Sequence, residues 1–226
     1  MKKILFSLFL TLVSTFVYAQ KDVTKFLGIP VDGLKSEMIK KLQAKGYVYN
    51  REGDYLKGEF NGANVNIFIV TNNNKVWRII LADEFKTDET SVKIRFNNLV
   101  RQFEKNERYL TLRDSDYTIP ANEDISYGIS VKSKRYEACY FQAPNPADSL
   151  ERFEKVTEYL KSQFTDEQLA DTTTLMQDLI KLNAQVYFME LWQKKSVWFM
   201  ISELYGKYFI TMFYDNEWNH SDGEDL

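Results

Sequence analysis

Hydrophobic residues near the carboxyl end of the chain form three dense runs separated by short breaks. The runs lie within residues 185–214, and the breaks are Lys194-Lys195 and Tyr205-Gly206. Aromatic and β-branched runs of this length, interrupted by turn residues, are typical of an antiparallel meander. Because strand side chains alternate between faces, both faces of this meander carry large apolar groups. We expect helices to cover one face, and more protein or a partner to cover the other.

The middle run shows this alternation most clearly. Val197, Phe199 and Ile201 are expected on one face, and Trp198 and Met200 on the other. The prediction of a second apolar face requires Trp198 and Met200 to be less deeply buried than Phe199.

The rest of the chain alternates between helical and strand periodicity. The predicted helices cover 35–44, a long segment opening at 87–89, and two segments that follow Asn145-Pro146 and Thr165. The predicted strands cover 47–50, 55–60, 65–71 and 76–81, with a hairpin at 125–131 and 136–142. Because strands occur in groups and do not alternate one by one with helices, we predict an α+β fold of antiparallel meanders packed against helices.

The predicted order is one helix, a meander of three or four strands, a helix, a hairpin, two helices and a three-stranded meander. We divide the chain into a signal peptide at 1–19, an N-terminal lobe at 20–113, a C-terminal lobe at 114–214 and an acidic flexible tail at 215–226. Both halves place a helix before a meander, which allows two related lobes.

The amino terminus has the pattern of a secretory signal peptide. Lys2 and Lys3 precede an apolar run at 4–17, and Val-Tyr-Ala at 17–19 is a small-residue cleavage site. The run is shorter than the roughly 20 residues of a membrane span. We expect cleavage after Ala19 and a periplasmic or secreted protein without a membrane span, with an uncleaved anchor as the alternative.

The residue inventory argues against most enzyme classes. Loss of the leader removes two lysines and changes the formal net charge from −3 to −5, which disfavours nucleic acid as a partner. Cys139, the only cysteine, is expected to be a buried apolar residue. His220, the only histidine, lies in the predicted tail, so imidazole-dependent catalysis and zinc binding are disfavoured. The sequence indicates no metal or cofactor, and we predict no enzyme.

Two carboxylates provide the alternative to a non-catalytic role. Glu190 and Glu203 each interrupt an apolar run of the predicted meander. Glycoside hydrolysis uses two carboxylates about 5 to 10 Å apart, and a buried carboxylate can act as an acid. The simpler interpretation is that these charges prevent sheets from stacking.

Aromatic residues suggest a binding surface. Exposed tryptophan and tyrosine on a rigid sheet can stack on sugars or anchor a protein. For any single aromatic residue, core packing is the simpler interpretation. Our candidates for an exposed platform are Trp192, Trp198, Tyr205 and Trp218.

Several segments resemble known families. Phe-Leu-Gly-Ile-Pro-Val-Asp-Gly at 26–33 and the helix at 35–42, with 94–99 and 122–127, resemble a family of uncharacterised exported proteins of Gram-negative gut anaerobes. That resemblance implies export and no particular site.

Residues 33–42 are also similar to a helix of β-lactamase-inhibitor-like and outer-membrane-assembly lipoprotein domains, which bind other proteins. In this chain Lys35 replaces the usual threonine, and no lipobox cysteine is present for membrane anchoring.

These observations lead to three functional hypotheses. The first is an exported, non-catalytic protein that binds an envelope protein or a glycan through the aromatic sheet. The second is a carboxylate-dependent glycan hydrolase. The third is a structural envelope domain whose sheet is covered by a second copy of the chain.

Overall fold

The computed structural model describes residues 22–111, 116–144 and 149–220. Its strands are β1 (Lys25–Phe26), β2 (Ile29–Pro30), β3 (Val48–Asn50), β4 (Tyr55–Phe60), β5 (Ala63–Asn72), β6 (Lys75–Asp83), β7 (Tyr109–Leu110), β8 (Glu137–Gln142), β9 (Ser196–Leu204) and β10 (Lys207–Asp215). Its helices are α2 (Lys35–Ala44), α3 (Glu89–Glu104), α4 (Ile125–Ser130), α5 (Ser149–Gln163), α6 (Asp166–Ala170), α7 (Thr174–Gln193) and the 3₁₀ turn η3 (Glu217–Asn219). The predicted signal peptide and its cleavage site lie outside the described residues.

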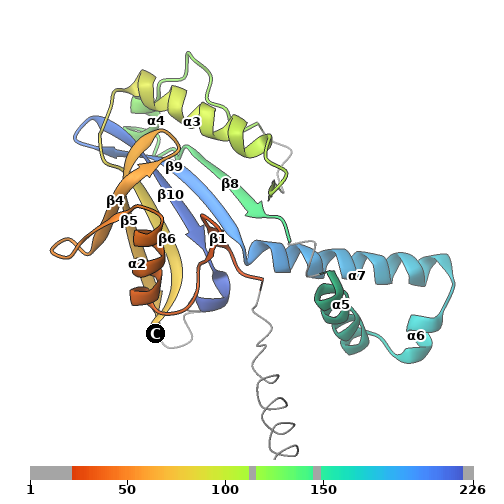
Figure 1. Ribbon diagram of the computed structural model, residues 1–226. Coiled ribbons are helices and arrows are strands. Elements are labelled where there is room, and N and C mark those ends of the chain that lie inside the picture. Colours follow the sequence, from red (N-terminus) through yellow and green to blue (C-terminus); the bar gives the residue numbers. More distant parts are fainter. Residues whose placement is uncertain (1–21, 112–115, 145–148, 221–226) are drawn as a thin grey trace, which may run out of the picture.

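Eight of these strands form one antiparallel sheet, in the order β3-β4-β5-β6-β10-β9-β8-β7. The strands β1 and β2 pair separately as a short hairpin. At the centre of the large sheet, β6 pairs with β10, and Ile80 lies opposite Phe213. Strands from both halves of the chain therefore belong to the same sheet (Figure 1). The predicted α+β class with antiparallel strands and helices is confirmed.

The two faces of the sheet are buried to different depths. On β9, Val197, Phe199 and Ile201 are buried on what we call the inner face. Trp198 and Met200, on the outer face, are only half-buried. The predicted alternation along this strand is therefore confirmed.

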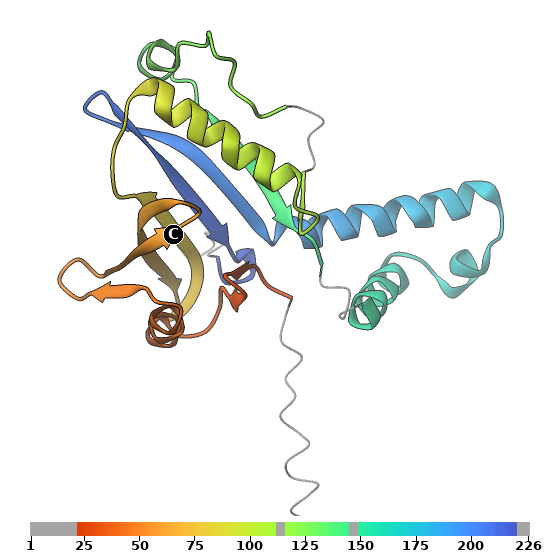
Figure 2. The same ribbon diagram turned by 45° about the horizontal axis from the view of Figure 1, so that its top comes forward.

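Helices α2 and α3 cover the inner face. The helix α3 begins at the N-cap Asp88, whose side chain accepts a hydrogen bond from the backbone N–H of Ser91. Figure 2 shows α3 lying across β9 and β10. Its predicted apolar stripe is buried and consists of Val92, Phe96, Leu99, Val100 and Phe103. The ring of Phe199 lies 5.1 Å from that of Phe96 and 5.5 Å from that of Phe103, between ring centroids. These contacts place the core between the helices and the sheet.

The predicted three-stranded meander at the carboxyl end is wrong in its first strand. Residues 185–193 continue the helix α7, which runs without interruption from Thr174 to Gln193. The segment that precedes Val186 contains leucine, methionine, lysine, glutamine and alanine, which are strong helix formers. A helix that is already formed needs no new nucleus, so it extends through the β-branched and aromatic residues at 186–188. Glu190 and Trp192 consequently lie on a helix.

The predicted hairpin at 125–131 and 136–142 is also wrong. Residues 125–130 form the helix α4, because the side chain of Asp124 accepts a hydrogen bond from the backbone N–H of Tyr127 and caps the helix. The alternation of Ile125, Tyr127 and Ile129 is what suggests a strand in the sequence. The second predicted strand is present as β8, and it pairs with β7 and β9.

The predicted flexible tail does not begin at residue 215. Asp215 ends β10 with its side chain buried, and Asn216 is buried beside it. The side chain of Asn216 donates a hydrogen bond of 2.7 Å to the backbone carbonyl of Val31, which ties the end of β10 to the amino-terminal segment. Residues 221–226 lie outside the described residues.

Substitution of Phe199 by alanine should destabilise the protein by about 3–5 kcal/mol, because it opens a cavity among the rings of Phe96, Phe103 and Tyr140. The matched change Phe209→Ala removes the same side chain from the half-buried outer face and should cost clearly less. Urea denaturation followed by circular dichroism measures both free energies of unfolding. Equal losses would contradict the assignment of the two faces.

Candidate functional site

The four predicted aromatic residues do not form one platform. Trp198 lies on β9, Tyr205 in the turn after β9, Trp218 in η3 and Trp192 in α7. The strand β9 has nine residues and spans roughly 30 Å. Tyr205, with 93% of its surface exposed, therefore lies far from Trp192, which precedes the strand.

The ring of Trp198 is already engaged within the outer face. It stacks on Phe213, with 3.9 Å between ring centroids and 12° between planes. Its indole Nε1 donates a hydrogen bond of 2.8 Å to the carboxylate of Asp215. Stacking on a sugar requires a free aromatic face. Trp198 is therefore a weaker sugar platform than its sequence position suggests.

Asp215 links Trp198 to a buried ion pair. Arg78 donates two hydrogen bonds to its carboxylate, from Nε to Oδ1 at 2.6 Å and from the terminal nitrogen to Oδ2 at 2.7 Å. The side chain of Asp215 is 2% exposed and that of Arg78 is 23% exposed. The guanidinium also lies 4.2 Å from the ring centroid of Trp77. This bidentate geometry fixes the position of both side chains.

Apolar side chains form a row across the outer face. Strand register places Phe68 opposite Ile80, Ile80 opposite Phe213, Phe213 opposite Trp198, and Trp198 opposite Cys139. Phe68 is exposed and the other four are half-buried. Cys139, expected to be a buried apolar residue, is only half-buried, because it points to the face opposite α3.

The two predicted acidic residues do not form a catalytic pair. Glu190 is exposed on α7, whereas Glu203 lies near the far end of β9. Glu203 lies seven positions beyond Ser196, which corresponds to roughly 23 Å of strand. The carboxylate of Glu203 accepts a hydrogen bond of 2.5 Å from the backbone N–H of Gly206, so it stabilises the turn. A separation of this size does not match the two-carboxylate geometry of glycoside hydrolysis.

The solitary histidine also lacks a catalytic setting. The ring of His220 lies 4.5 Å from that of Trp77, and its Nδ1 lies 3.3 Å from the carboxylate of Glu217. Burial raises the pKa of Glu217 above its usual value, and the neighbouring charge of Asp215 adds to the effect. Within the described ranges, no group of three or more His, Cys, Asp and Glu side chains is placed to hold a metal ion.

Helices α5, α6 and α7 form an arm that projects from the edge of the sheet (Figure 1). We call this segment the helical arm. Within it Tyr159 and Tyr187 stack, with 4.3 Å between ring centroids and 6° between planes. Val156 is buried between α5 and α7. The helix α7 packs against α5, α6 and the strand β8. One side of α7 is half-buried, and it carries Met176, Ile180, Ala184, Tyr187, Phe188 and Leu191.

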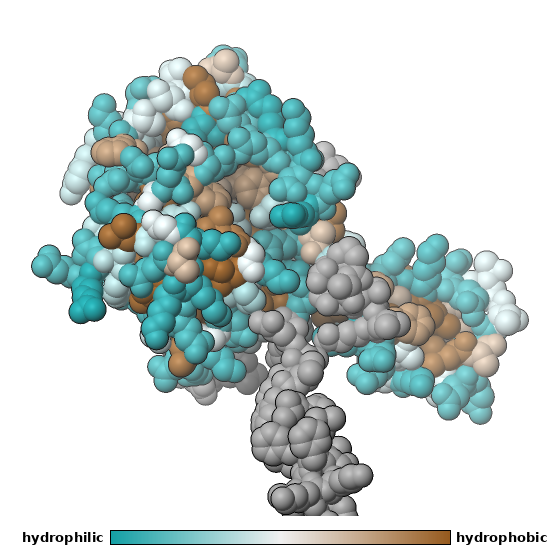
Figure 3. All heavy atoms as spheres, viewed as in Figure 1, coloured by the Kyte–Doolittle hydropathy of each residue, from teal (hydrophilic) through white to brown (hydrophobic). Residues whose placement is uncertain are grey.

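The other side of α7 carries a second set of large apolar side chains, which we call the heptad stripe. Its members are exposed and are Leu175, Leu179, Leu182, Val186 and Met189. They follow one another at steps of four, three, four and three residues, which is the spacing of a coiled-coil seam. Figure 3 shows apolar surface on the helical arm between polar residues.

The heptad stripe was not predicted from the sequence, although the signal for it is present there. The spacing is visible in the sequence, but the strand predicted at 185–193 cuts the stripe after Leu182. The apolar residues that pack inside the arm also obscure the pattern, because they make α7 apolar on two sides.

Comparison with known proteins gave no match to a family model, a curated protein or a solved structure. Of the helices in the described ranges, none is both long enough and apolar enough to cross a membrane.

Substitution of Asp215 by asparagine should destabilise the protein by about 2–4 kcal/mol, because it leaves the half-buried Arg78 without its counter-charge. As a matched control, Asp54→Asn removes the charge from the exposed pair with Lys35 and should cost less than about 1 kcal/mol. Urea denaturation at neutral pH compares the two. A loss at Asp215 no larger than that of the control would contradict its structural role.

Proposed function

We propose that this chain is an exported, non-catalytic binding protein, and that its helical arm recognises an amphipathic helix of another protein. The proposal of export depends on the leader sequence. The proposal of binding depends on one observation, the exposed heptad stripe on α7.

Burial of the heptad stripe by a partner would supply part of the free energy of binding. Full burial of a leucine, valine or methionine side chain contributes about 1.5–3 kcal/mol. The five members expose about half of their surface, so a partner would gain on the order of 5 kcal/mol from them. Micromolar affinity corresponds to about 8 kcal/mol. The stripe therefore supplies a substantial part of such an affinity.

The spacing of the stripe favours a helical partner. Steps of four and three residues place each side chain where it can insert between four residues of a facing helix. Since α7 has 20 residues, it offers roughly 30 Å of helix for such packing.

A protein partner at the arm is favoured over a glycan at the sheet. The ring of Trp198 is held by Phe213 and Asp215, whereas the side chains of the heptad stripe are exposed. The stripe also consists of aliphatic side chains, which cannot stack on sugar rings.

Replacement of Leu179 and Leu182 by glutamine should abolish partner binding and leave the fold intact, because both side chains are exposed. A photo-crosslinking residue at Gln185, beside the stripe, should give one adduct of defined mass in the native cell. The same residue at Tyr205 should not, and the double substitution should remove the adduct.

The control double variant is Leu34→Gln with Val48→Gln, which changes two exposed apolar residues outside the arm. It should retain the adduct. An adduct of twice the mass of the chain would replace the proposed partner by a second copy. Absence of any adduct from Gln185, or its persistence in the double variant, would overturn the proposal.

A further inference from the structure

A cavity of about 710 Å³ opens between the β1–β2 hairpin and the edge formed by β7 and the end of β8. Ligand pockets for small molecules typically have volumes of about 300–1,000 Å³. The cavity is distinct from the heptad stripe, and it contains none of the residues predicted from the sequence to form a site. We call it the hairpin pocket.

The wall of the hairpin pocket is fixed by paired hydrogen bonds. The side chain of Gln142 accepts a hydrogen bond of 2.7 Å from the backbone N–H of Lys25 and donates one of 2.6 Å to its carbonyl. The hairpin is therefore attached to β8 much as a neighbouring strand would be. A pocket with such a wall needs little ordering when a ligand enters.

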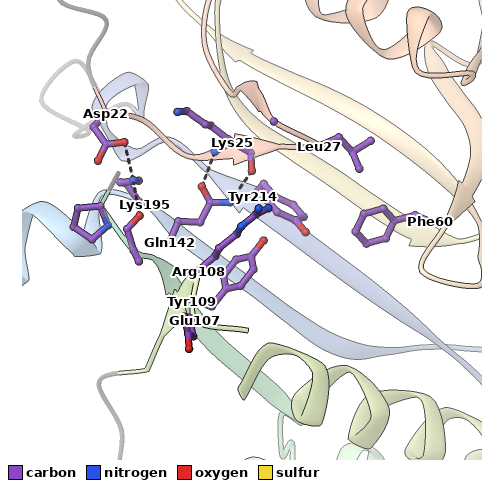
Figure 4. Close-up of a pocket in the computed structure, with 13 residues that line it drawn as sticks. Asp22, Lys25, Leu27, Phe60, Glu107, Arg108, Tyr109, Gln142, Lys195 and Tyr214 are labelled. Atoms are coloured by element: carbon purple, nitrogen blue, oxygen red, sulfur yellow. Dashed lines mark hydrogen bonds and ion pairs between the residues drawn. The ribbon is translucent and has the colours of Figure 1, made fainter. Parts of the chain in front are cut away.

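One end of the pocket is apolar. Figure 4 shows Leu27 and Phe60 together at this end, with Tyr214 between them and the polar end. Tyr214 is buried, and burial raises the pKa of its hydroxyl well above the usual value. The hydroxyl is therefore neutral at physiological pH, and the ring offers an uncharged surface.

Leu27 has a backbone conformation that is unfavourable for leucine. Leu27 and Gly28 have φ angles of +52° and +80°, which are the signs required by a type I′ hairpin turn. The first such position normally carries asparagine, aspartate or glycine, because a larger side chain is strained there. An apolar side chain is thus held at the pocket despite its local cost, as is common at binding sites.

The other end of the pocket is cationic. Lys195 is buried and forms an ion pair with Asp22 at 2.8 Å, so these two charges neutralise each other. Among the described residues, the guanidinium of Arg108 has no ion pair or side-chain hydrogen bond. Figure 4 shows it directed towards Tyr214, whereas Glu107 points away from the pocket. Among the described residues that line the pocket, three positive charges (Lys25, Arg108 and Lys195) outnumber two negative charges (Asp22 and Glu107), next to an apolar wall.

We propose that the hairpin pocket binds a small organic anion with an apolar chain, whose charged head contacts Arg108 and whose chain lies between Leu27 and Phe60. Guanidinium groups bind carboxylates and phosphates through paired, charge-assisted hydrogen bonds. Apolar chains gain free energy when they leave water for a pocket lined by leucine and aromatic rings.

Isothermal titration of the purified protein tests this proposal with dodecanoate, dodecyl phosphate and dodecyltrimethylammonium, each below its micelle concentration. We expect saturable one-to-one binding of at least one anion, and binding of the cation at least about tenfold weaker, since charge-assisted hydrogen bonds contribute about 1.5–3 kcal/mol. The two anions show whether the natural head group is a carboxylate or a phosphate. No saturable binding of either anion, or equal affinity for the cation, would overturn the proposal.

Two variants locate the ligand. Arg108→Gln should weaken binding of the anion about tenfold or more, whereas Lys86→Gln, which removes an exposed positive charge elsewhere, should not change it. Leu27→Asn should also weaken binding while it keeps or raises the thermal midpoint, because asparagine suits the turn. Unchanged affinity in both Arg108→Gln and Leu27→Asn would place the ligand elsewhere.

The same titration separates this proposal from the proposed function of the arm. The variant with Leu179→Gln and Leu182→Gln should bind the anion as tightly as the unmodified protein. Loss of binding in that variant, with binding retained by Arg108→Gln, would assign the anion to the heptad stripe and overturn the pocket.

Discussion

The pairing of β6 with β10 joins the two halves of the chain, and the Arg78–Asp215 ion pair lies directly across this junction. Several contacts from distant parts of the sequence converge there. The hydroxyl of Thr24 donates a hydrogen bond to the backbone carbonyl of Asp215, and the backbone N–H of Asn216 donates one of 2.7 Å to the carbonyl of Trp77. One cluster of polar groups therefore holds the amino-terminal segment, β6 and β10 together. The rings of Trp77 and Trp198 pack beside this cluster.

The local elements of the fold could be predicted from the sequence, because their signals are local. The apolar stripe of α3 and the alternation along β9 each depend on the spacing of neighbouring residues, and both were predicted correctly. The pairing of β6 with β10 could not be predicted, because it joins segments more than a hundred residues apart and no local pattern specifies it. Asp215 was misread for the same reason, since its partner Arg78 is equally distant in the sequence.

The candidate sites differ in how far the sequence could reveal them. The heptad stripe is present in the spacing of five residues, and it was concealed by the wrong strand prediction and by the apolar residues on the other side of α7. The hairpin pocket has no such signal, because Leu27, Arg108 and Tyr214 become neighbours only through the sheet.

The helical arm and the hairpin pocket are connected at the base of the arm. Lys195 lies two residues after the end of α7 and forms an ion pair with Asp22. Its backbone carbonyl accepts a hydrogen bond of 3.0 Å from the backbone N–H of Gln142.

The central position of β10 has a consequence for how the protein folds. This strand lies between β6 and β9, yet along the sequence it follows the other seven strands of the sheet. Until β10 pairs, β6 has an unpaired edge, and the segments on either side of it cannot join into one sheet. The sheet is therefore complete only when residues 207–215 have docked, and a chain truncated before residue 207 exposes an edge on which other chains can aggregate.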